Sequence, residues 1–474
     1  MKLLIKLELL LCLFALADWE CGTHPDNEPT LKILEETESH REILSRKNSL
    51  APIRIHVEYY NFDLGSSSRN RYFKNEVMNA TINWFNRVLQ VYPVENNLRI
   101  RTSDCGGIPV PEDHKDKGVE ADLVVYLTTK YESDKGYAAY AGACALQGRS
   151  PNNIIAGRAV VNSAKFTGET FEYQMNVMVH EITHLLGFSS SMFRYFRNSK
   201  GDRYDDDELV DREKIRGYYK YVVKSPTVLK KAREVFKCRS LEGVELESSG
   251  GSGTAGSHWE MRVMFNDFMN SHIVTDPVYS SISMTLLEDS GWYKINWDYT
   301  QDNLWGKGKG CSFHTEKCLE DGKPQFSEFC SESKPACDTF HLYKGQCNLG
   351  KFRSKLPSDF RYFDSPYVGG TNSFIDYCPY RVGYSNGSCR GTGSKKTSTT
   401  SVFHEVVGPN SRCFETTLVE KGWRLGSDEF HTACYEVVKC QRDRAYVRVW
   451  DEIVECPFTG GKVRVDGMTG YLYC

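Results

Sequence analysis

The chain has no long apolar segment after its first 17 residues. No later run approaches the roughly 18 apolar residues that a membrane-spanning helix needs, so the sequence predicts no transmembrane helix. The final residues, Gly470 to Cys474, lack the hydrophobic tail of a lipid-anchor (GPI) signal, although association with a cell surface by other means stays open. The formal net charge is only −3, which argues against nucleic acid as a partner.

The first residues instead have the pattern of a secretory signal peptide. Lys2 and Lys6 precede a leucine-rich run that is too short to span a bilayer, and Ala15-Leu16-Ala17 fits a small-residue cleavage site. We therefore expect a signal peptide over residues 1–17 and a secreted, extracellular or luminal protein. Residues 18–50 are highly charged and poor in aromatic residues, which predicts a propeptide without a strand.

Cysteine usage is consistent with this compartment. The sequence has 17 cysteines, of which Cys12 lies in the predicted signal. Twelve lie between Cys311 and Cys474, a density typical of a disulfide-rich extracellular module. Cys105 and Cys144 are far from that cluster and could pair with each other. Two sequons for N-glycosylation begin at Asn79 and Asn386.

Strands and helices are expected to alternate before residue 190. Period-two or continuous apolar patterns predict strands at 53–59, 121–128 and 154–161, and helical spacing of apolar residues predicts a helix at 73–91. The predicted fold class is therefore α+β, with a mixed sheet and a long helix that follows it.

The long helix expected after the predicted sheet contains, in its second half, the sequence His180-Glu181-Ile182-Thr183-His184. Residues i and i+4 lie on one face of a helix, so the two histidines can bind one Zn²⁺ ion while Glu181 lies beside its open position. Such a site activates water for hydrolysis, with the carboxylate as general base. Gly187 then ends the helix, because glycine readily adopts the left-handed conformation of a helix terminus.

A catalytic zinc ion normally has a third protein ligand. The residues alone leave two candidates open. One is Glu208, which would give a thermolysin-like site, and the other is His258, in Gly256-Ser257-His258.

Several further motifs resemble those of the leishmanolysin family of metzincin zinc metallopeptidases. The motif through Gly187-Phe188 resembles the metzincin zinc motif, although Ser190 stands where most metzincins have their third histidine. A long insertion with a glycine-rich stretch before a later histidine is typical of the leishmanolysin branch. The other matching motifs are Leu241 to Glu247, Ser283-Met284-Thr285, Asp289 to Tyr293, and Cys456-Pro457 to Cys474.

The resemblance implies roles for individual residues. It makes His258 the third ligand of one Zn²⁺ ion and Met284 the residue of the methionine turn below the metal. It also implies a metzincin-like catalytic domain and a propeptide cysteine, Cys21, that can block the metal as a thiolate. In this sequence, however, Cys21 and His24 are one residue further apart than the expected form. If Cys21 is free, one other cysteine must also be unpaired, and Cys238 is our candidate; otherwise Cys21 is in a disulfide.

The sequence thus predicts a secreted zinc endopeptidase that cleaves proteins or peptides, with Glu181 as general base. The alternatives are an adhesion or binding protein whose metal site is catalytically silent, and the thermolysin-like peptidase that uses Glu208. The expected domains are the signal peptide at 1–17, a propeptide at 18–50, a catalytic subdomain at 51–188, an insertion with the third ligand and the methionine turn at 189–309, and a cysteine-rich C-terminal domain at 310–474.

Overall fold

The computed structural model contains two compact units, one ending at Glu316 and the other beginning at Lys317. The described residues are 32–34, 49–147, 153–251, 254–272, 274, 276–391, 396–397, 402–423 and 430–474. The predicted signal peptide and Cys21 lie outside them.

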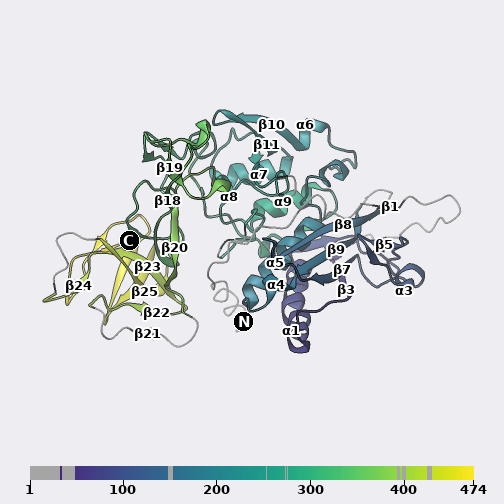
Figure 1. Ribbon diagram of the computed structural model, residues 1–474, viewed down its shortest axis with the longest axis horizontal. Coiled ribbons are helices and arrows are strands. Elements are labelled where there is room, and N and C mark those ends of the chain that lie inside the picture. Colours follow the sequence, from purple (N-terminus) through teal and green to yellow (C-terminus); the bar gives the residue numbers. More distant parts are fainter. Residues whose placement is uncertain are drawn as a thin grey trace. The chain divides into compact units, whose positions relative to one another are not determined.

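A five-stranded mixed sheet forms the frame of the first unit (Figure 1). Neighbouring strands are parallel except for the antiparallel pair β8 and β9. In spatial order the strands are β1 (Lys32–Leu34), β8 (Ala139–Gln147), β9 (Ile154–Asn162), β7 (Leu123–Lys130) and β3 (Ile55–Tyr59). The three strands predicted from sequence are confirmed. Strand β8 was missed, and strand β1 corrects the expectation that the leader contains no strand.

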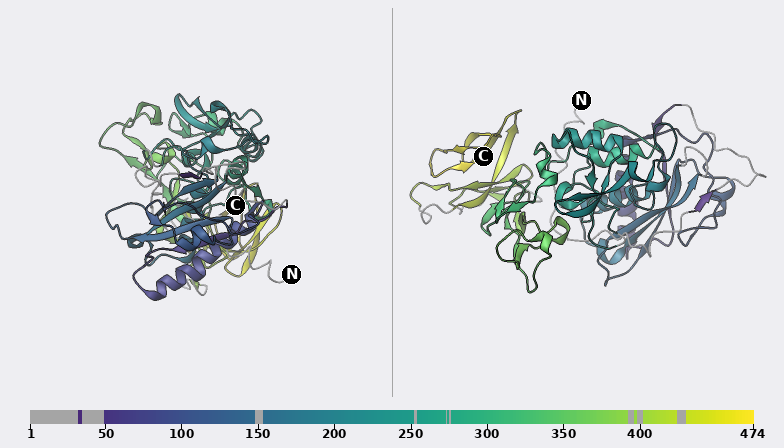
Figure 2. Two further views of the ribbon diagram at one scale, coloured as in Figure 1. Left: turned by 90° about the vertical axis from the view of Figure 1, so that its right-hand side faces the viewer. Right: turned by 90° about the horizontal axis from the view of Figure 1, so that it is seen from above.

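Helices cover one face of this sheet. Helix α5 (Phe171–Leu185) packs on β8 and β9, and the helical segment of α1 (Ser67–Tyr72), the π-helical turn Phe73–Met78 and α2 (Asn79–Val88) packs beside α5. Figure 1 and the left view of Figure 2 show this segment, in purple, along the blue strands. Val77, Phe85 and Val88 are fully buried, which confirms the helical spacing, but the helix ends at Val88 and the last three residues of the predicted helix form strand β4 (Leu89–Val91).

Gly157 allows α5 to approach the sheet closely. A Cβ atom at this position in β9 would lie 2.3 Å from Cγ of Leu185. Any side chain here would therefore push the end of α5, which carries the two histidines, away from the strand.

The rest of the first unit follows α5. A small antiparallel sheet contains β10, β11 and β12, and α7 packs against α9. The disulfide Cys238–Cys311 closes this region, so the expectation that Cys238 is unpaired was wrong. The elements are α6 (Asp206–Leu209), β10 (Val210–Ile215), β11 (Tyr218–Val223), α7 (Pro226–Phe236), β12 (Val244–Glu245), α8 (Met261–Met264) and α9 (Ser281–Asp289).

The second unit is built from β-strands and disulfides. Its largest sheet has six antiparallel strands in the order β27, β26, β25, β23, β30 and β28. These are β23 (Ser411–Thr416), β25 (His431–Cys440), β26 (Arg444–Val449), β27 (Glu452–Pro457), β28 (Lys462–Val463) and β30 (Leu472–Tyr473). A smaller sheet contains β16 (Pro335–Cys337), β17 (Tyr343–Cys347) and β20 (Arg381–Ser388).

Five disulfides hold this unit together, which confirms the prediction of a disulfide-rich C-terminal region. They are Cys318–Cys378, Cys330–Cys347, Cys337–Cys413, Cys389–Cys434 and Cys456–Cys474. Cys105 and Cys144 also pair, in the first unit. Among the described cysteines, only the exposed Cys440 is unpaired.

Candidate metal centre

Helix α5 carries the two motif histidines, and both are buried in the first unit. Thr170 caps its start by accepting a hydrogen bond from the backbone N–H of Tyr173, and the helix ends at Leu185. Gly187 follows with φ of 128°, as predicted for a helix stop, and a Cβ there would lie only 3.0 Å from the Trp292 ring. His180, Glu181 and His184 are each at most 2% exposed.

Three imidazoles meet at one point. The Nε2 atom of His184 lies 3.0 Å from that of His180 and 3.1 Å from that of His258, and the third pair is 3.3 Å apart. Tetrahedral ligands at about 2.0–2.1 Å from a zinc ion would be separated by roughly 3.3 Å. The spacing therefore suits three nitrogen ligands around one metal ion.

The opposite ring nitrogens fix the orientation of these imidazoles. Nδ1 of His180 lies 2.6 Å from the carbonyl oxygen of Phe268, and Nδ1 of His184 lies 2.6 Å from that of Phe188. Nδ1 of His258 lies 3.0 Å from the carbonyl oxygen of Thr254. A carbonyl can only accept, so each Nδ1 carries the proton and donates it, which leaves each Nε2 with a lone pair.

Burial keeps the three rings neutral. It lowers the pKa of His180 to about 4 and holds the pKa values of His184 and His258 well below the usual histidine range. Three converging lone pairs cannot hydrogen-bond to one another, so this donor set fits a bound cation. Borderline metals such as Zn²⁺ take imidazole ligands readily.

The two ends of the insertion lie side by side, because Ser190 contacts Ser257. The backbone N–H of Ser190 donates to Oγ of Ser257 at 3.1 Å, and the two hydroxyl oxygens are 3.2 Å apart. His258 thus directly follows a serine that contacts Ser190, six residues after His184. The insertion between Ser190 and Ser257 therefore does not prevent the imidazole of His258 from lying beside those of His180 and His184.

Backbone pairing with the insertion sheet then fixes the segment that carries His258. The N–H of Glu247 donates to the carbonyl of His258 at 2.9 Å, and the N–H of Glu260 donates to that of Glu245 at 2.9 Å. Strand β12 thereby joins this segment to β11.

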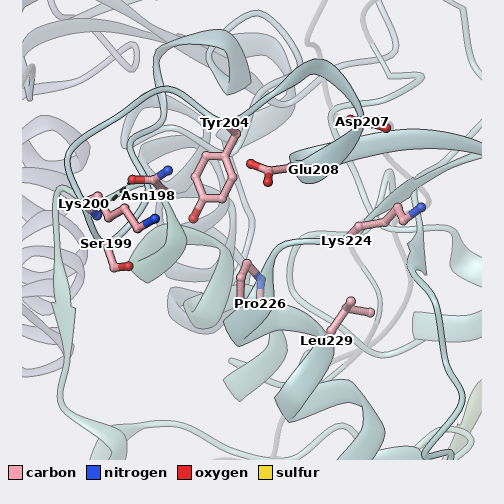
Figure 3. Close-up of a pocket in the computed structure, with 9 residues that line it drawn as sticks. All are labelled: Asn198, Ser199, Lys200, Tyr204, Asp207, Glu208, Lys224, Pro226 and Leu229. Carbon is pink, nitrogen blue, oxygen red and sulfur yellow. Dashed lines mark hydrogen bonds between the residues drawn. The ribbon is translucent and has the colours of Figure 1, made fainter.

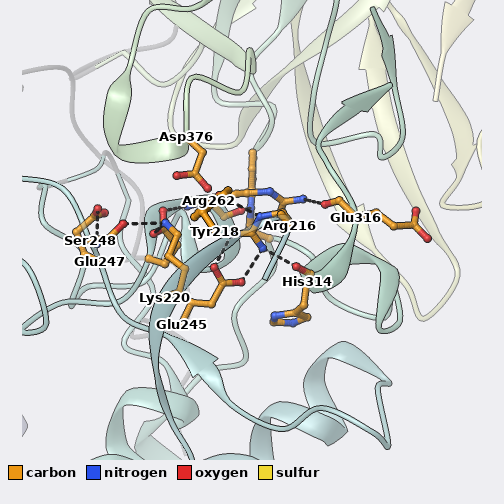
Figure 4. Close-up of polar contacts among 12 residues, drawn as sticks. Arg216, Tyr218, Lys220, Glu245, Glu247, Ser248, Arg262, His314, Glu316 and Asp376 are labelled. Carbon is orange, nitrogen blue, oxygen red and sulfur yellow. Dashed lines mark hydrogen bonds and ion pairs between the residues drawn. The ribbon is translucent and has the colours of Figure 1, made fainter. Parts of the chain in front are cut away.

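Buried charges lie beside the same pairing (Figure 4). The Lys220 ammonium group forms an ion pair with Glu260, and both side chains are fully buried. Arg216 binds both carboxylate oxygens of Glu245, where again almost no surface is exposed. The sequence shows that these residues are charged, but no pattern in it predicts which of them form pairs.

A turn after α8 supports His180. Asp267 accepts hydrogen bonds from the Met269 N–H at 2.7 Å and from the Ser283 hydroxyl at 2.7 Å, and so holds the Phe268 carbonyl near the ring. Burial raises the pKa of Asp267 to about 6. No pattern in the sequence predicted Asp267 or this turn.

Met284, the predicted residue of the methionine turn, and Met269 lie in different kinds of secondary structure. Met284 is fully buried within helix α9, whereas the equally buried Met269 lies in the turn that supports His180. The structure therefore has a methionine at a turn beside the histidines, at a position that the sequence analysis did not select.

Glu208 has a different role from the one considered for it. Its side chain accepts from the backbone N–H of Asp205 and so caps α6. It also lines a pocket of about 460 Å³ together with Tyr204 and Lys224 (Figure 3). Among the described residues, the group of potential metal ligands that contains His180 and His184 includes His258 and not Glu208, so the thermolysin-like ligand set is not favoured.

Both predicted glycosylation sites are accessible. Asn79 is exposed at the start of α2, and Asn386 is exposed on β20. Their modification stays a prediction. Within the described residues, no helix has the length and apolarity needed to cross a membrane.

The sequence comparisons agree with the site. Residues 61–474 match the model of the leishmanolysin peptidase family. The chain is 32% identical over 381 residues to a leishmanolysin homolog from Crithidia fasciculata, covering 79% of this chain and 56% of that protein. It is 30% identical over 340 residues to leishmanolysin from Leishmania tropica, covering 71% and 50%. A leishmanolysin-like peptidase from Drosophila melanogaster is 28% identical over 457 residues, covering 77% and 66%.

The chain belongs to the leishmanolysin family. It spans about half the length of the first two of these relatives. The α+β class is confirmed by its helices, mixed sheet and disulfides.

Proposed function

We propose that this protein is a secreted zinc-dependent endopeptidase of metzincin-like architecture that cleaves protein or peptide substrates. One observation carries the proposal: three neutral imidazoles converge with their Nε2 atoms 3.0–3.3 Å apart, and the residue that follows His180 in the helix is the buried Glu181. The family membership supports it. The seven disulfides among the described residues support an extracellular or luminal location.

His180, His184 and His258 would hold the ion. Bound Zn²⁺ supplies Lewis acidity to a peptide carbonyl and lowers the pKa of water. Glu181 is the next residue after His180, so its carboxylate lies beside the site and can accept a proton from the attacking water. It then delivers that proton to the nitrogen of the departing amine. The carbonyls of Phe268, Phe188 and Thr254 keep the three rings oriented during this transfer.

The methionine turn is better assigned to Met269 than to Met284. Met269 lies in a turn whose neighbouring carbonyl contacts His180, whereas Met284 lies in a helix. We propose this assignment in place of the one implied by the sequence resemblance.

The ligand set is tested by two variants of the full chain. His258→Ala should lose both bound zinc and peptidase activity, because two imidazoles cannot complete the site. Glu208→Ala should keep both, because Glu208 caps a short helix. Zinc content by mass spectrometry and cleavage of casein would be measured for each. The reverse pattern would overturn the proposal.

Latency is proposed through the leader. The backbone of Lys32–Leu34 already pairs with Ala145 to Gln147 of strand β8, so part of the leader occupies this edge of the catalytic sheet. The cysteine count also permits a free Cys21: fourteen cysteines are paired, and Cys440 is the unpaired one outside the leader. A thiolate is a strong zinc ligand and would exclude water.

Cys21→Ser should therefore make the uncleaved chain active, whereas the wild type should need cleavage near Leu50. Peptide mapping without reduction is the control. A disulfide between Cys21 and another cysteine, with Cys440 the obvious partner, would exclude the thiolate switch.

A further inference from the structure

A second group of potential metal ligands lies on the opposite face of the catalytic sheet. It consists of His56, Glu58 and His114. Alternate residues of a strand share a face, so His56 and Glu58 of β3 lie on one side and Val57 on the other. Val57 packs against the main core, which includes the buried apolar residues of α5. His56 and Glu58 therefore face away from the helix that carries the three-histidine site.

Helix α3 (Glu112–Asp116) supplies the third member of the group. His114 is 8% exposed and lies over β7, where Tyr126 is the partner of Glu58 in the parallel strand register. Tyr126 belongs to the smaller core on this face. Two neighbouring strands and a helix thus bring two imidazoles and a carboxylate together.

The distances suit a shared metal ion better than hydrogen bonds. Oε2 of Glu58 lies 3.5 Å from Nε2 of His56 and 3.7 Å from Nε2 of His114. All three ligand atoms lie within 4.8 Å of one another. Hydrogen bonds of this kind are normally about 2.7–3.2 Å long, whereas ligands around one zinc ion are roughly 3.3 Å apart.

The outer contacts also suit metal ligation. Nδ1 of His114 lies 3.0 Å from the phenol oxygen of Tyr126, and donation of its proton to that oxygen leaves Nε2 with a lone pair toward Glu58. Nε2 of His56 is buried and has no hydrogen-bond partner.

We propose that His56, Glu58 and His114 form a second site, for a divalent transition-metal ion of the Zn²⁺ type. Two imidazoles and one carboxylate match the ligand preference of zinc and not that of Ca²⁺ or Mg²⁺, which bind oxygen atoms. The side chains of His56 and Glu58 are 40% and 37% exposed, so an ion can enter from solution and retain water. Bound there, it ties α3 to the edge strand β3.

The site is tested by counting metal ions in the full chain. The purified wild type, loaded with Zn²⁺ and dialysed against metal-free buffer, should retain two equivalents by mass spectrometry. His56→Asn and Glu58→Gln should each retain one fewer than the wild type. Both replaced side chains are partly exposed, which favours normal folding. The difference from wild type does not depend on what the three-histidine site holds.

His404→Gln is the matched control. His404 also lies beside a carboxylate, with Nε2 3.3 Å from Oε2 of Glu420, but belongs to no three-ligand group among the described residues. Its replacement should leave the count unchanged. The midpoint of thermal unfolding, followed during Zn²⁺ titration of the His258→Ala chain, should rise, and the rise should disappear when His56→Asn is added.

Three results would overturn the proposal. One is a wild type that retains a single equivalent, with that equivalent lost in the His258→Ala chain. Another is a His56→Asn chain that retains as many ions as the wild type. The third is a second equivalent that binds only at millimolar Zn²⁺, which would identify an adventitious ion only.

Discussion

The two parts of the chain that supply the three-histidine site are held in place by different forces. Helix α5 is held by apolar burial: Val177, Met178, Ile182 and Leu185 are fully buried on or near the sheet. The segment that carries His258 is held by backbone pairing with the insertion and by the buried ion pairs of Glu245 and Glu260. Apolar packing tolerates similar shapes, whereas a buried ion pair requires both partners. The two parts should therefore respond differently to mutation.

The largest effect is expected where the chemistry occurs. Glu181→Gln should lower kcat by on the order of 10²–10⁴ while zinc content stays near that of the wild type, because in the proposed mechanism the carboxylate moves a proton and does not bind the metal. Glu172→Gln, in the first turn of the same helix, is the control and should keep activity. Substantial casein cleavage by the purified Glu181→Gln chain would contradict the mechanism.

The ion pair beside His258 provides the next test. Lys220→Met leaves the Glu260 carboxylate buried beside no ammonium group, which should cost about 3–5 kcal/mol of unfolding free energy and lower zinc retention. Lys224→Met is the matched control, because Lys224 pairs with Asp211 at a partly exposed position and should cost at most about 1 kcal/mol.

Adding Glu260→Gln to Lys220→Met should recover much of the lost stability, since it removes the isolated charge. The unfolding free energies of Lys220→Met, Lys224→Met and the double variant would be measured by urea unfolding. Equal losses for Lys220→Met and Lys224→Met would show that burial of charge is not what holds this segment.

Leu185→Ala probes the apolar side of the comparison. Loss of this fully buried side chain should cost about 2–5 kcal/mol through transfer and cavity terms. Gly157→Ala should destabilise the wild type, because its Cβ would lie 2.3 Å from Cγ of Leu185. The same change in the Leu185→Ala chain should be neutral or stabilising, because it fills part of the cavity. Additive losses in urea unfolding would contradict the close approach of α5 and β9.

Asp267 gives the smallest effect, and it depends on pH. Its pKa is raised to about 6 by burial, so the folded chain binds its proton more tightly than the unfolded chain does. Stability from this group is therefore fully present below about pH 4 and falls as the pH rises to about 6, by on the order of 2–3 kcal/mol.

Asp267→Asn should remove that component. The difference in unfolding free energy between the wild type and Asp267→Asn should shift in favour of the variant between pH 4 and pH 7. A difference that stays constant over this range would show that the carboxyl group is not perturbed.

Local patterns determined much of the first unit from sequence. Strands β3, β7 and β9 and the helix before residue 91 follow from apolar periodicity, and Gly187 ends α5 as its conformational freedom predicts. Strand β8 was missed because its run of alanine, glycine and cysteine has small side chains and no clear alternation. Such a strand is specified by its neighbours in the sheet.

The sequence by itself determined the histidine pair, because positions i and i+4 of a helix always share a face. It left Glu208 and His258 open as third ligands, and only the family resemblance favoured His258. The tertiary structure brings Ser257 back to Ser190 and places His258 beside His184, through pairings between residues far apart in the chain. Only the tertiary structure shows that Cys238 pairs with Cys311 and that His56 and Glu58 lie beside His114. Such contacts depend on how strands and helices pack, so they leave no periodic pattern in the sequence.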